Sequence, residues 1–285
     1  MSGDNNRIAG DASTLYVSDM DGTLLRPDAE LSSYTVETLN RLIRGGMSFT
    51  VASARSLASA RAILAPLALS LPVILMNGVQ IYDLRAGRFL HVEYIPEEAL
   101  HLLLDLFKFY DVSGFLYGLV DDLQTTYYET LGSPAQKAFM EERIQRYQKP
   151  FTQVSSYRDI ADRGICYVSL MGKHDRLVPV RDALSRIPGL AHVFYADVYF
   201  DEEWLLEIHS AQASKGHAVR SLRDRFGFGR LVGFGDNLND QSMFAACDET
   251  YAVGNAHPVL AASATGQIGT NRDDGVARWL AAQYE

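Results

Sequence analysis

The sequence predicts an α/β protein in which a parallel-sheet domain is interrupted by a second α/β domain. Near the N-terminus, apolar runs typical of buried strands alternate with segments of helical spacing, and this alternation favours right-handed crossovers in a parallel sheet. Most of the aromatic residues then fall between residues 88 and 208, and the first pattern returns from Lys215 onward. We therefore expect residues 1–87 and 209–285 to form one domain and residues 88–208 to form an insertion in it.

The individual elements follow from composition and spacing. Before the insertion, strands are expected at 14–19, 47–53 and 72–77, helices at 33–46 and 56–67, and a hairpin at 79–95. Within the insertion, helices are expected at 96–109, 134–148 and 175–187, and strands at 113–119, 151–154, 165–171, 191–196 and 204–209. After it, strands at 230–236, 249–255 and 266–271 alternate with helices at 215–228, 240–247, 258–264 and 274–284.

The chain is acidic, with 35 Asp and Glu against 26 Lys and Arg and a net charge of -9. A nucleic acid or an anionic membrane surface needs a cationic face on its partner, so neither is expected as a partner. A small anionic substrate remains compatible with this charge because a site can be positive locally. No feature of the sequence indicates an obligate protein partner.

Cysteine usage and hydropathy bear on the compartment. Cys166 and Cys247 lie far apart and form no CxxC motif, which argues against a disulfide framework and a zinc site. Residues 1–13 are polar and lack the apolar stretch of a signal peptide. The most apolar segment, 62–76, contains two prolines and is shorter than the roughly 20 residues of a membrane-spanning helix. These features predict a cytoplasmic protein.

Reactive side chains follow the carboxyl ends of the expected strands, which is where open parallel sheets bind ligands. Asp19 ends the first strand and Asp21 comes two residues later, so an extended backbone would point both carboxylates to one side. Further reactive groups follow the second strand, begin a helix and occupy the run 233–240: Ser53, Lys215, Asp236, Asn239 and Asp240.

Several carboxylates in one crevice raise one another's pKa values unless a cation compensates them. Mg²⁺ suits this arrangement, because it prefers oxygen ligands and is often held by one or two carboxylates together with a substrate phosphate. Lys215 and the hydroxyl of Ser53 suit the remaining phosphate oxygens. We therefore expect a phosphoryl-transfer site in which one carboxylate attacks phosphorus and another handles the proton.

These residues resemble the motifs of the haloacid dehalogenase superfamily of phosphatases, and more narrowly its Cof-type subfamily with a C2B cap. The four catalytic motifs of that family resemble DMDGTLL (19–25), ASARS (52–56), SKG (214–216) and GDNLND (235–240). Further family signatures resemble MNG (76–78), VGNA (253–256) and NRDDGVA (271–277). The resemblance implies a Rossmann-like parallel-sheet core typical of this superfamily, with an inserted α/β cap domain.

Carried over by position, the resemblance makes Asp19 the nucleophile that forms an aspartyl phosphate and Asp21 the general acid and base. It implies a Mg²⁺ site built from Asp19, the backbone carbonyl of Asp21 and Asp236. Asp240 would support these ligands.

The resemblance also implies a set of phosphate contacts, made by side chains or by backbone amides: Met20, Ser53, Ala54, Lys215 and Asn239. Two positions depart from the usual second motif. Ser53 replaces a threonine but keeps the hydroxyl, and Ala54 replaces a glycine but keeps its amide. Four other residues are possible contacts to the substrate or the cap: Arg55, Asn77, Asp197 and His209.

The expected function is hydrolysis of a small phosphorylated metabolite, either a sugar phosphate or a phosphorylated cofactor, because a large cap would exclude protein substrates. A phosphomutase with a sugar hydroxyl as acceptor and a non-catalytic metabolite-binding regulator remain open alternatives. A signalling receiver also combines an acidic cluster with a lysine. Receivers are shorter, however, lack a cap and lack an acid at the position of Asp21.

Overall fold

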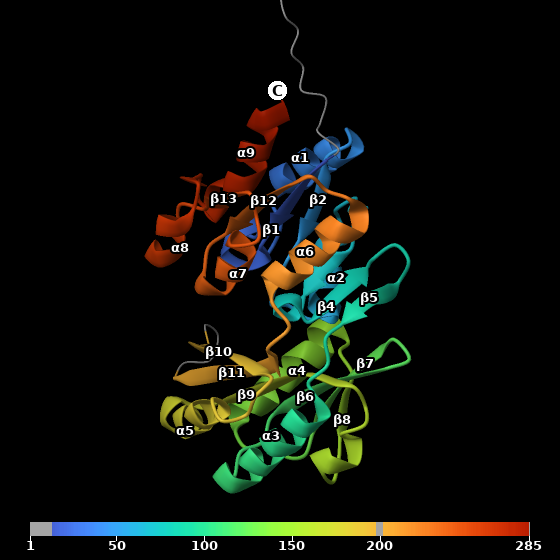
Figure 1. The fold of residues 1–285 in the computed structure, drawn as a ribbon, viewed down its shortest axis with the longest axis vertical. Coiled ribbons are helices and arrows are strands. Elements are labelled where there is room, and N and C mark those ends of the chain that lie inside the picture. The colour runs from blue at the N-terminus through green and yellow to red at the C-terminus, as the bar shows by residue number, and fades with distance from the viewer. Residues whose placement is uncertain (1–12, 198–201, 285) are drawn as a thin grey trace, which may run out of the picture. The chain divides into compact units, whose positions relative to one another are not determined.

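The computed structural model describes residues 13–197 and 202–284, and the chain divides into two compact units. It passes from the first unit to the second after Leu90 and returns at Ser214. We call the residues up to Leu90 and from Ser214 onward the core unit, and His91–Ala213 the inserted unit. Figure 1 shows the ribbon of both units. The sequence placed the two crossings at 87–88 and 208–209.

The core unit is built on a five-stranded parallel sheet in the order β14-β13-β12-β1-β2. Its strands are β1 (Thr14–Ser18), β2 (Ser48–Val51), β12 (Arg230–Gly235), β13 (Glu249–Ala252) and β14 (Gly266–Gln267). The interior strand β1 therefore pairs with β2, from before the insertion, and with β12, from after it. This sheet confirms the predicted α/β fold class.

Both faces of the core sheet are covered, because every residue of β1 is buried although its side chains alternate between the two faces. Leu15 and Val17 share one apolar cluster with Val219. Tyr16 points to the other face, where its ring lies 6.5 Å from that of Trp279. The helices are α1 (Ser33–Arg44), α2 (Leu57–Leu64), α6 (Lys215–Phe226), α7 (Gln241–Phe244), α8 (Pro258–Ser263) and α9 (Gly275–Tyr284).

A small three-stranded sheet lies beside the core sheet and differs from the expectation. β3 (Val73–Leu75), β4 (Gln80–Asp83) and β5 (Arg88–Val92) follow one another in it, and β3 and β4 pair antiparallel. The sequence predicted residues 72–77 as a third strand of the parallel sheet. Its connection to the segment after β2 is an isolated parallel bridge between Ala52 and Ile74 with a few backbone hydrogen bonds, such as that from the Ser53 amide to the Ile74 carbonyl at 2.9 Å, and β3 ends at Leu75.

The inserted unit has its own six-stranded sheet, in the order β10-β11-β9-β6-β7-β8. Its strands are β6 (Phe115–Val120), β7 (Leu123–Tyr128), β8 (Phe151–Gln153), β9 (Ile165–Lys173), β10 (Leu190–Ala196) and β11 (Glu203–Ser210). β7 was not among the predicted strands. Its sequence LQTTYY has little apolar alternation, so its pairing with β6 was visible only in the fold.

The described part of this unit has these α-helices beside the sheet: α3 (Glu97–Tyr110), α4 (Pro134–Tyr147) and α5 (His174–Leu184). Leu103 of α3 and Val180 of α5 belong to one buried cluster with Val168 and Leu206 of the sheet. The ring of Phe139 in α4 instead stacks on Phe115 with 5.3 Å between centroids. Across the described residues, none of the helices combines the length and apolarity needed to cross a membrane.

Candidate active site

Reactive side chains gather at the carboxyl ends of three neighbouring strands of the core sheet. Asp19 follows β1, Asp236 follows β12, and Ser53 lies just beyond the end of β2. β1 pairs with β12 and with β2 in parallel register, so these three ends lie along one edge. The sheet topology therefore brings together residues that are more than 200 positions apart in the chain.

Lys215 links two of the acidic side chains. It is the first residue of α6, which Ser214 caps by accepting the amide of His217. The ammonium of Lys215 is fully buried and donates to Asp19 Oδ1 at 2.5 Å and to Asp240 Oδ1 at 2.7 Å. Burial alone would lower the pKa of Lys215, but the two carboxylates outweigh it and raise that pKa above its usual range. Lys215 is therefore charged at neutral pH.

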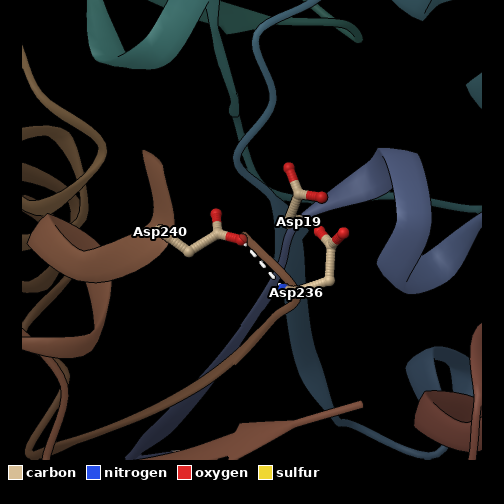
Figure 2. A group of neighbouring side chains, drawn as sticks. All are labelled: Asp19, Asp236 and Asp240. Carbon is tan, nitrogen blue, oxygen red and sulfur yellow. Dashed lines mark hydrogen bonds between the residues drawn. The ribbon is translucent and has the colours of Figure 1, made fainter. Parts of the chain in front are cut away.

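Asp240 holds the loop that carries Asp236. Its second oxygen, Oδ2, accepts the backbone amides of Asp236 at 3.0 Å and Asn237 at 3.1 Å. Figure 2 shows the bond from the Asp236 amide. Asp240 is completely buried, and its two oxygens receive three donors when Lys215 is included. These contacts suit a residue that orients Asp236 and Lys215.

Three carboxylates converge at the centre of the site. One oxygen each of Asp19, Asp236 and Asp240 lies within 4.8 Å of the others. Figure 2 shows these three side chains. Burial raises the pKa of Asp19 well above its usual range, with contributions from Asp240 and Asp236 against the opposing charge of Lys215. Burial together with Asp240 raises the pKa of Asp236 to about 6. One ammonium does not compensate three carboxylates, so a hard divalent cation such as Mg²⁺ fits this set of oxygens.

The turn after Asp19 also positions Asp236. The hydroxyl of Thr23 donates to Asp236 Oδ1 at 3.1 Å. Gly22 has a φ of 81°, and a Cβ at this position would come within 2.3 Å of Asp236 Oδ2. Only glycine therefore allows the loop to approach the carboxylate this closely.

Asp21 lies outside the group of three carboxylates. The chain turns tightly over Met20–Leu24, and Asp21 is not one of the three carboxylates whose oxygens lie within 4.8 Å of one another. The Asp21 side chain is 48% exposed and accepts Arg55 Nε at 2.7 Å and Nη2 at 2.6 Å. Its charge still contributes to the raised pKa of Asp236. Asp21 thus occupies the solvent-facing edge of the site.

The predicted phosphate contacts lie near this cluster in the core unit. Ser53 is fully buried, its hydroxyl accepts the amide of Arg55 at 3.1 Å, and Ala54 between them is partly buried. The backbone amide of Asn77 donates to the Ser53 carbonyl at 3.0 Å. The side-chain oxygen of Asn77 accepts a hydrogen bond from Asn239 Nδ2 at 3.3 Å. Asn77 therefore connects the segment after β2 to the segment after β12.

Asp197 and His209 belong to the inserted unit. His209 is buried on β11, where its ring stacks on Tyr167 with 5.7 Å between centroids and its Nδ1 lies 2.9 Å from the Ser210 carbonyl. Burial lowers the pKa of His209. The amide of Asp197 donates to the Glu203 carbonyl at 2.8 Å. A contact of either residue with substrate stays a prediction.

Two asparagines hold the turn that follows Asp19, a role that the sequence did not reveal. Asn255 Nδ2 donates to the Gly22 carbonyl and Asn271 Nδ2 to the Leu25 carbonyl, each at 2.8 Å. Asn255 Oδ1 also accepts the amide of Asn271 at 3.0 Å. The motifs at 253–256 and 271–277 marked these positions as family signatures, but their distance from residue 19 in sequence concealed the contact.

Comparisons with known proteins agree over almost the whole chain. A family model for haloacid dehalogenase-like hydrolases matches residues 16–280. Pyridoxal phosphate phosphatase YbhA of Escherichia coli is 27% identical over 265 residues, covering 92% of this chain and 95% of that protein. The 5-amino-6-(5-phospho-D-ribitylamino)uracil phosphatase YitU of Bacillus subtilis is 26% identical, covering 93% of this chain and 96% of that protein. A haloacid dehalogenase-like hydrolase structure from Bacteroides thetaiotaomicron has a TM-score of 0.78 at 21% identity, covering 95% of this chain and 99% of that chain.

Proposed function

The chain belongs to the haloacid dehalogenase-like hydrolase family, and we propose that it is a Mg²⁺-dependent phosphatase of a small phosphorylated metabolite. The observation that carries the proposal is the environment of the Asp19 carboxylate. It follows the interior strand β1, accepts a hydrogen bond from buried Lys215 and lies in an acidic cluster that suits a divalent cation. The two relatives described above are phosphatases, which supports the same class of activity.

Asp19 is the nucleophile. Its carboxylate oxygen attacks the phosphorus of the ester, the bond from phosphorus to the leaving oxygen breaks, and an aspartyl phosphate forms. Water then attacks this phosphorus, which releases inorganic phosphate and restores the carboxylate. Lys215 stays beside Asp19 in both steps and offsets the negative charge of the phosphoryl oxygens.

Asp21 is the general acid and base. It gives a proton to the leaving oxygen in the first step and takes a proton from the attacking water in the second. Its exposed position suits proton exchange with solvent, and the two hydrogen bonds from Arg55 orient the carboxylate.

The Mg²⁺ ion would be held by Asp19, Asp236 and the backbone carbonyl of Asp21. Asp240 would fix the loop that carries Asp236, because its carboxylate accepts the backbone amide of Asp236. The bound ion would supply positive charge to the transferring phosphoryl group. The remaining phosphate oxygens are bound by side chains and backbone amides near the cluster: Met20, Ser53, Ala54, Lys215 and Asn239.

The substrate is a small phosphorylated metabolite. The relatives act on pyridoxal phosphate and on 5-amino-6-(5-phospho-D-ribitylamino)uracil, and both molecules contain a nitrogen heterocycle. We therefore favour a phosphorylated cofactor or a related heterocyclic metabolite over a sugar phosphate.

Phosphate release from a panel of sugar phosphates, nucleotides and phosphorylated cofactors, with and without Mg²⁺, tests this function. We expect metal-dependent turnover that is lost in Asp19→Asn, with that variant still folded by circular dichroism. If folded wild-type protein with Mg²⁺ releases phosphate from none of these esters, the phosphatase proposal fails. Activity that requires a bisphosphorylated activator would instead identify a phosphomutase.

A further inference from the structure

Helix α3 carries apolar side chains on two sides. Leu103 and Phe107 belong to the buried cluster that the inserted sheet, α3 and α5 share. Leu102, Leu106 and Phe109 occupy the i, i+4 and i+7 positions of a second stripe along the same helix. Phe109 is 79% exposed, the highest value among the large apolar residues that the structure describes, and Leu102 is 49% exposed. A helix that is apolar on two sides is normally covered on both.

This second stripe forms one wall of a surface groove in the inserted unit. The other wall consists of the last turn of α5 and the residues after it, among them Ala183 and Ile187. The groove has a volume of about 440 Å³. Figure 1 shows the two neighbouring helices, α3 and α5, that supply its walls. An exposed apolar patch with a polar rim is typical of an interaction surface.

Side chains of opposite charge stand on the two walls. Asp105 of α3 lines the groove with a side chain that is 64% exposed, and Arg158 contacts its Oδ1 atom. Arg186 lines the other wall, is exposed and forms no ion pair with the residues that the structure describes. The lining therefore has no net charge, although the whole chain carries a net charge of -9. A neutral surface of this kind lets two copies of an acidic protein approach each other.

We propose that this groove is the interface of a homodimer whose two-fold axis runs along the groove. A symmetric dimer uses the same patch on both copies, so the patch must complement itself. Rotation about this axis lays the α3 wall of each copy on the α5 wall of the other and leaves positions along the groove unchanged. Asp105 of one copy then meets Arg186 of the other, and the symmetry repeats this ion pair. A membrane surface would cover the apolar residues but give the opposite charges on the two walls no partners.

Phe109 is the anchor of this interface. It projects from the α3 wall and contacts the apolar residues of the facing wall, Ala183 and Ile187 of the other copy. Aromatic side chains in such positions are typical hot spots, because they bury a large and rigid surface. All of these residues belong to the inserted unit, so the interface does not depend on the proposed phosphatase activity.

Sedimentation equilibrium of the full chain at micromolar concentrations tests the dimer. We expect the wild type to reach the mass of two chains. Phe109→Ser should raise the dissociation constant of the dimer at least about 30-fold, the effect of removing a hot-spot aromatic side chain. Leu123→Ser is the matched control, because Leu123 is 70% exposed on β7 of the same unit but does not line the groove. This control should keep the wild-type dissociation constant, and melting curves should show both variants folded.

A charge exchange tests the direction of the two-fold axis. In a homodimer of Asp105→Lys or of Arg186→Glu, like charges face each other, so each variant alone should dimerise at least about tenfold more weakly than the wild type. An equimolar mixture restores both contacts, because the introduced lysine faces the introduced glutamate and the native Asp105 faces the native Arg186. The mixture should therefore form heterodimers with the wild-type affinity. An axis across the groove would lay α3 on α3 and give no such rescue.

Several outcomes would overturn the proposal. A wild type that stays monomeric at the highest concentration rules out the dimer. A dimer that is unchanged in Phe109→Ser, or weakened equally in Leu123→Ser, uses another surface. A mixture of the two charge variants that associates as weakly as each alone contradicts the axis along the groove. Binding of a monomeric wild type to phosphatidylcholine vesicles, lost in Phe109→Ser, would assign the groove to a membrane surface instead of a second copy.

Discussion

Lys215 lies between two buried carboxylates, with its ammonium 2.5 Å from Asp19 Oδ1 and 2.7 Å from Asp240 Oδ1. One side chain therefore contacts both the proposed nucleophile and the residue that orients the proposed metal ligand Asp236. Breaking a buried pair costs more than the pair contributes, because the remaining charge stays buried and uncompensated.

Lys215→Met should therefore affect both stability and catalysis. We expect a loss of about 3–5 kcal/mol in the free energy of unfolding without metal, measured by urea denaturation. We also expect kcat to fall by roughly 10²–10³-fold, because one preorganised cation at the phosphoryl group is lost. Lys137→Met is the control, with an exposed lysine on the inserted unit. Wild-type stability and kcat in Lys215→Met would contradict the arrangement.

Mg²⁺ should stabilise the protein by binding the acidic cluster. At a concentration about 100 times its Kd, a ligand of the folded state adds about 2.7 kcal/mol to the free energy of unfolding. We expect the melting temperature to rise with Mg²⁺ in the wild type and not in Asp236→Asn. Asp224→Asn on the exposed side of α6 is the control and should keep the full shift. An undiminished shift in Asp236→Asn would place the metal elsewhere.

Asp21→Asn should leave the metal-induced shift in melting temperature largely intact and reduce kcat severely. Its side chain is half exposed and pairs with Arg55 outside the acidic cluster, so the substitution leaves the three buried carboxylates in place. Loss of a general acid and base typically costs about 10²–10⁴-fold in rate. Steady-state kinetics beside a Mg²⁺ melting series tests this, and full activity in the variant would remove Asp21 from the mechanism.

Lys149 should make stability depend on pH. Its pKa is lowered from 10.5 to about 7 in the folded protein, chiefly by burial, so between these values the unfolded chain binds more protons than the folded chain. The free energy of unfolding therefore gains a contribution that rises with pH from about 7 to 10.5. Relative to the wild type, Lys149→Met should be stabilised most near pH 7 and progressively less toward pH 10.

Urea titrations at pH 7, 8 and 9 measure this difference. Lys137→Met, which removes an exposed lysine, should show no such trend relative to wild type. If the free energy of unfolding of Lys149→Met differs from that of the wild type by the same amount at each pH, Lys149 keeps an ordinary pKa in the folded state.

Asn271→Ala should loosen the turn that carries Asp21. Asn271 donates to the Leu25 carbonyl in a buried hydrogen bond at 2.8 Å, and alanine would leave this carbonyl without its partner. We expect a loss of about 1–3 kcal/mol in the free energy of unfolding, measured by urea denaturation. Hydrogen exchange should also rise in the turn after Asp19. Unchanged exchange there would show that Asn255 alone is sufficient to hold it.

Much of the architecture was determined by local sequence. Apolar runs and helical spacing predicted the parallel sheet, and the structure and the matched family confirm the α/β class and the resemblance to haloacid dehalogenases. The order of reactive residues along the chain predicted that Asp19 and Asp236 would meet, because parallel strands end at one edge. The catalytic and binding roles of these residues remain predictions.

Other features depended on contacts between distant segments. β3 ends at Leu75 and pairs antiparallel with β4. Its apolar sequence VIL suits a strand of the parallel core sheet equally well, so the sequence did not determine which strand it pairs with. The turn over Met20–Leu24 is held by two asparagines that lie more than 200 residues away in the chain, Asn255 and Asn271.

Sequence by itself determined which chemistry is available, since residue types and their spacing along one strand or helix are local properties. Tertiary structure alone decided which of these groups are paired. Lys215 acquires two carboxylates and Lys149 none, although both are buried lysines. The difference is physical, because the energy of a buried charge depends on the atoms that surround it, and these come from segments whose approach only the folded chain specifies.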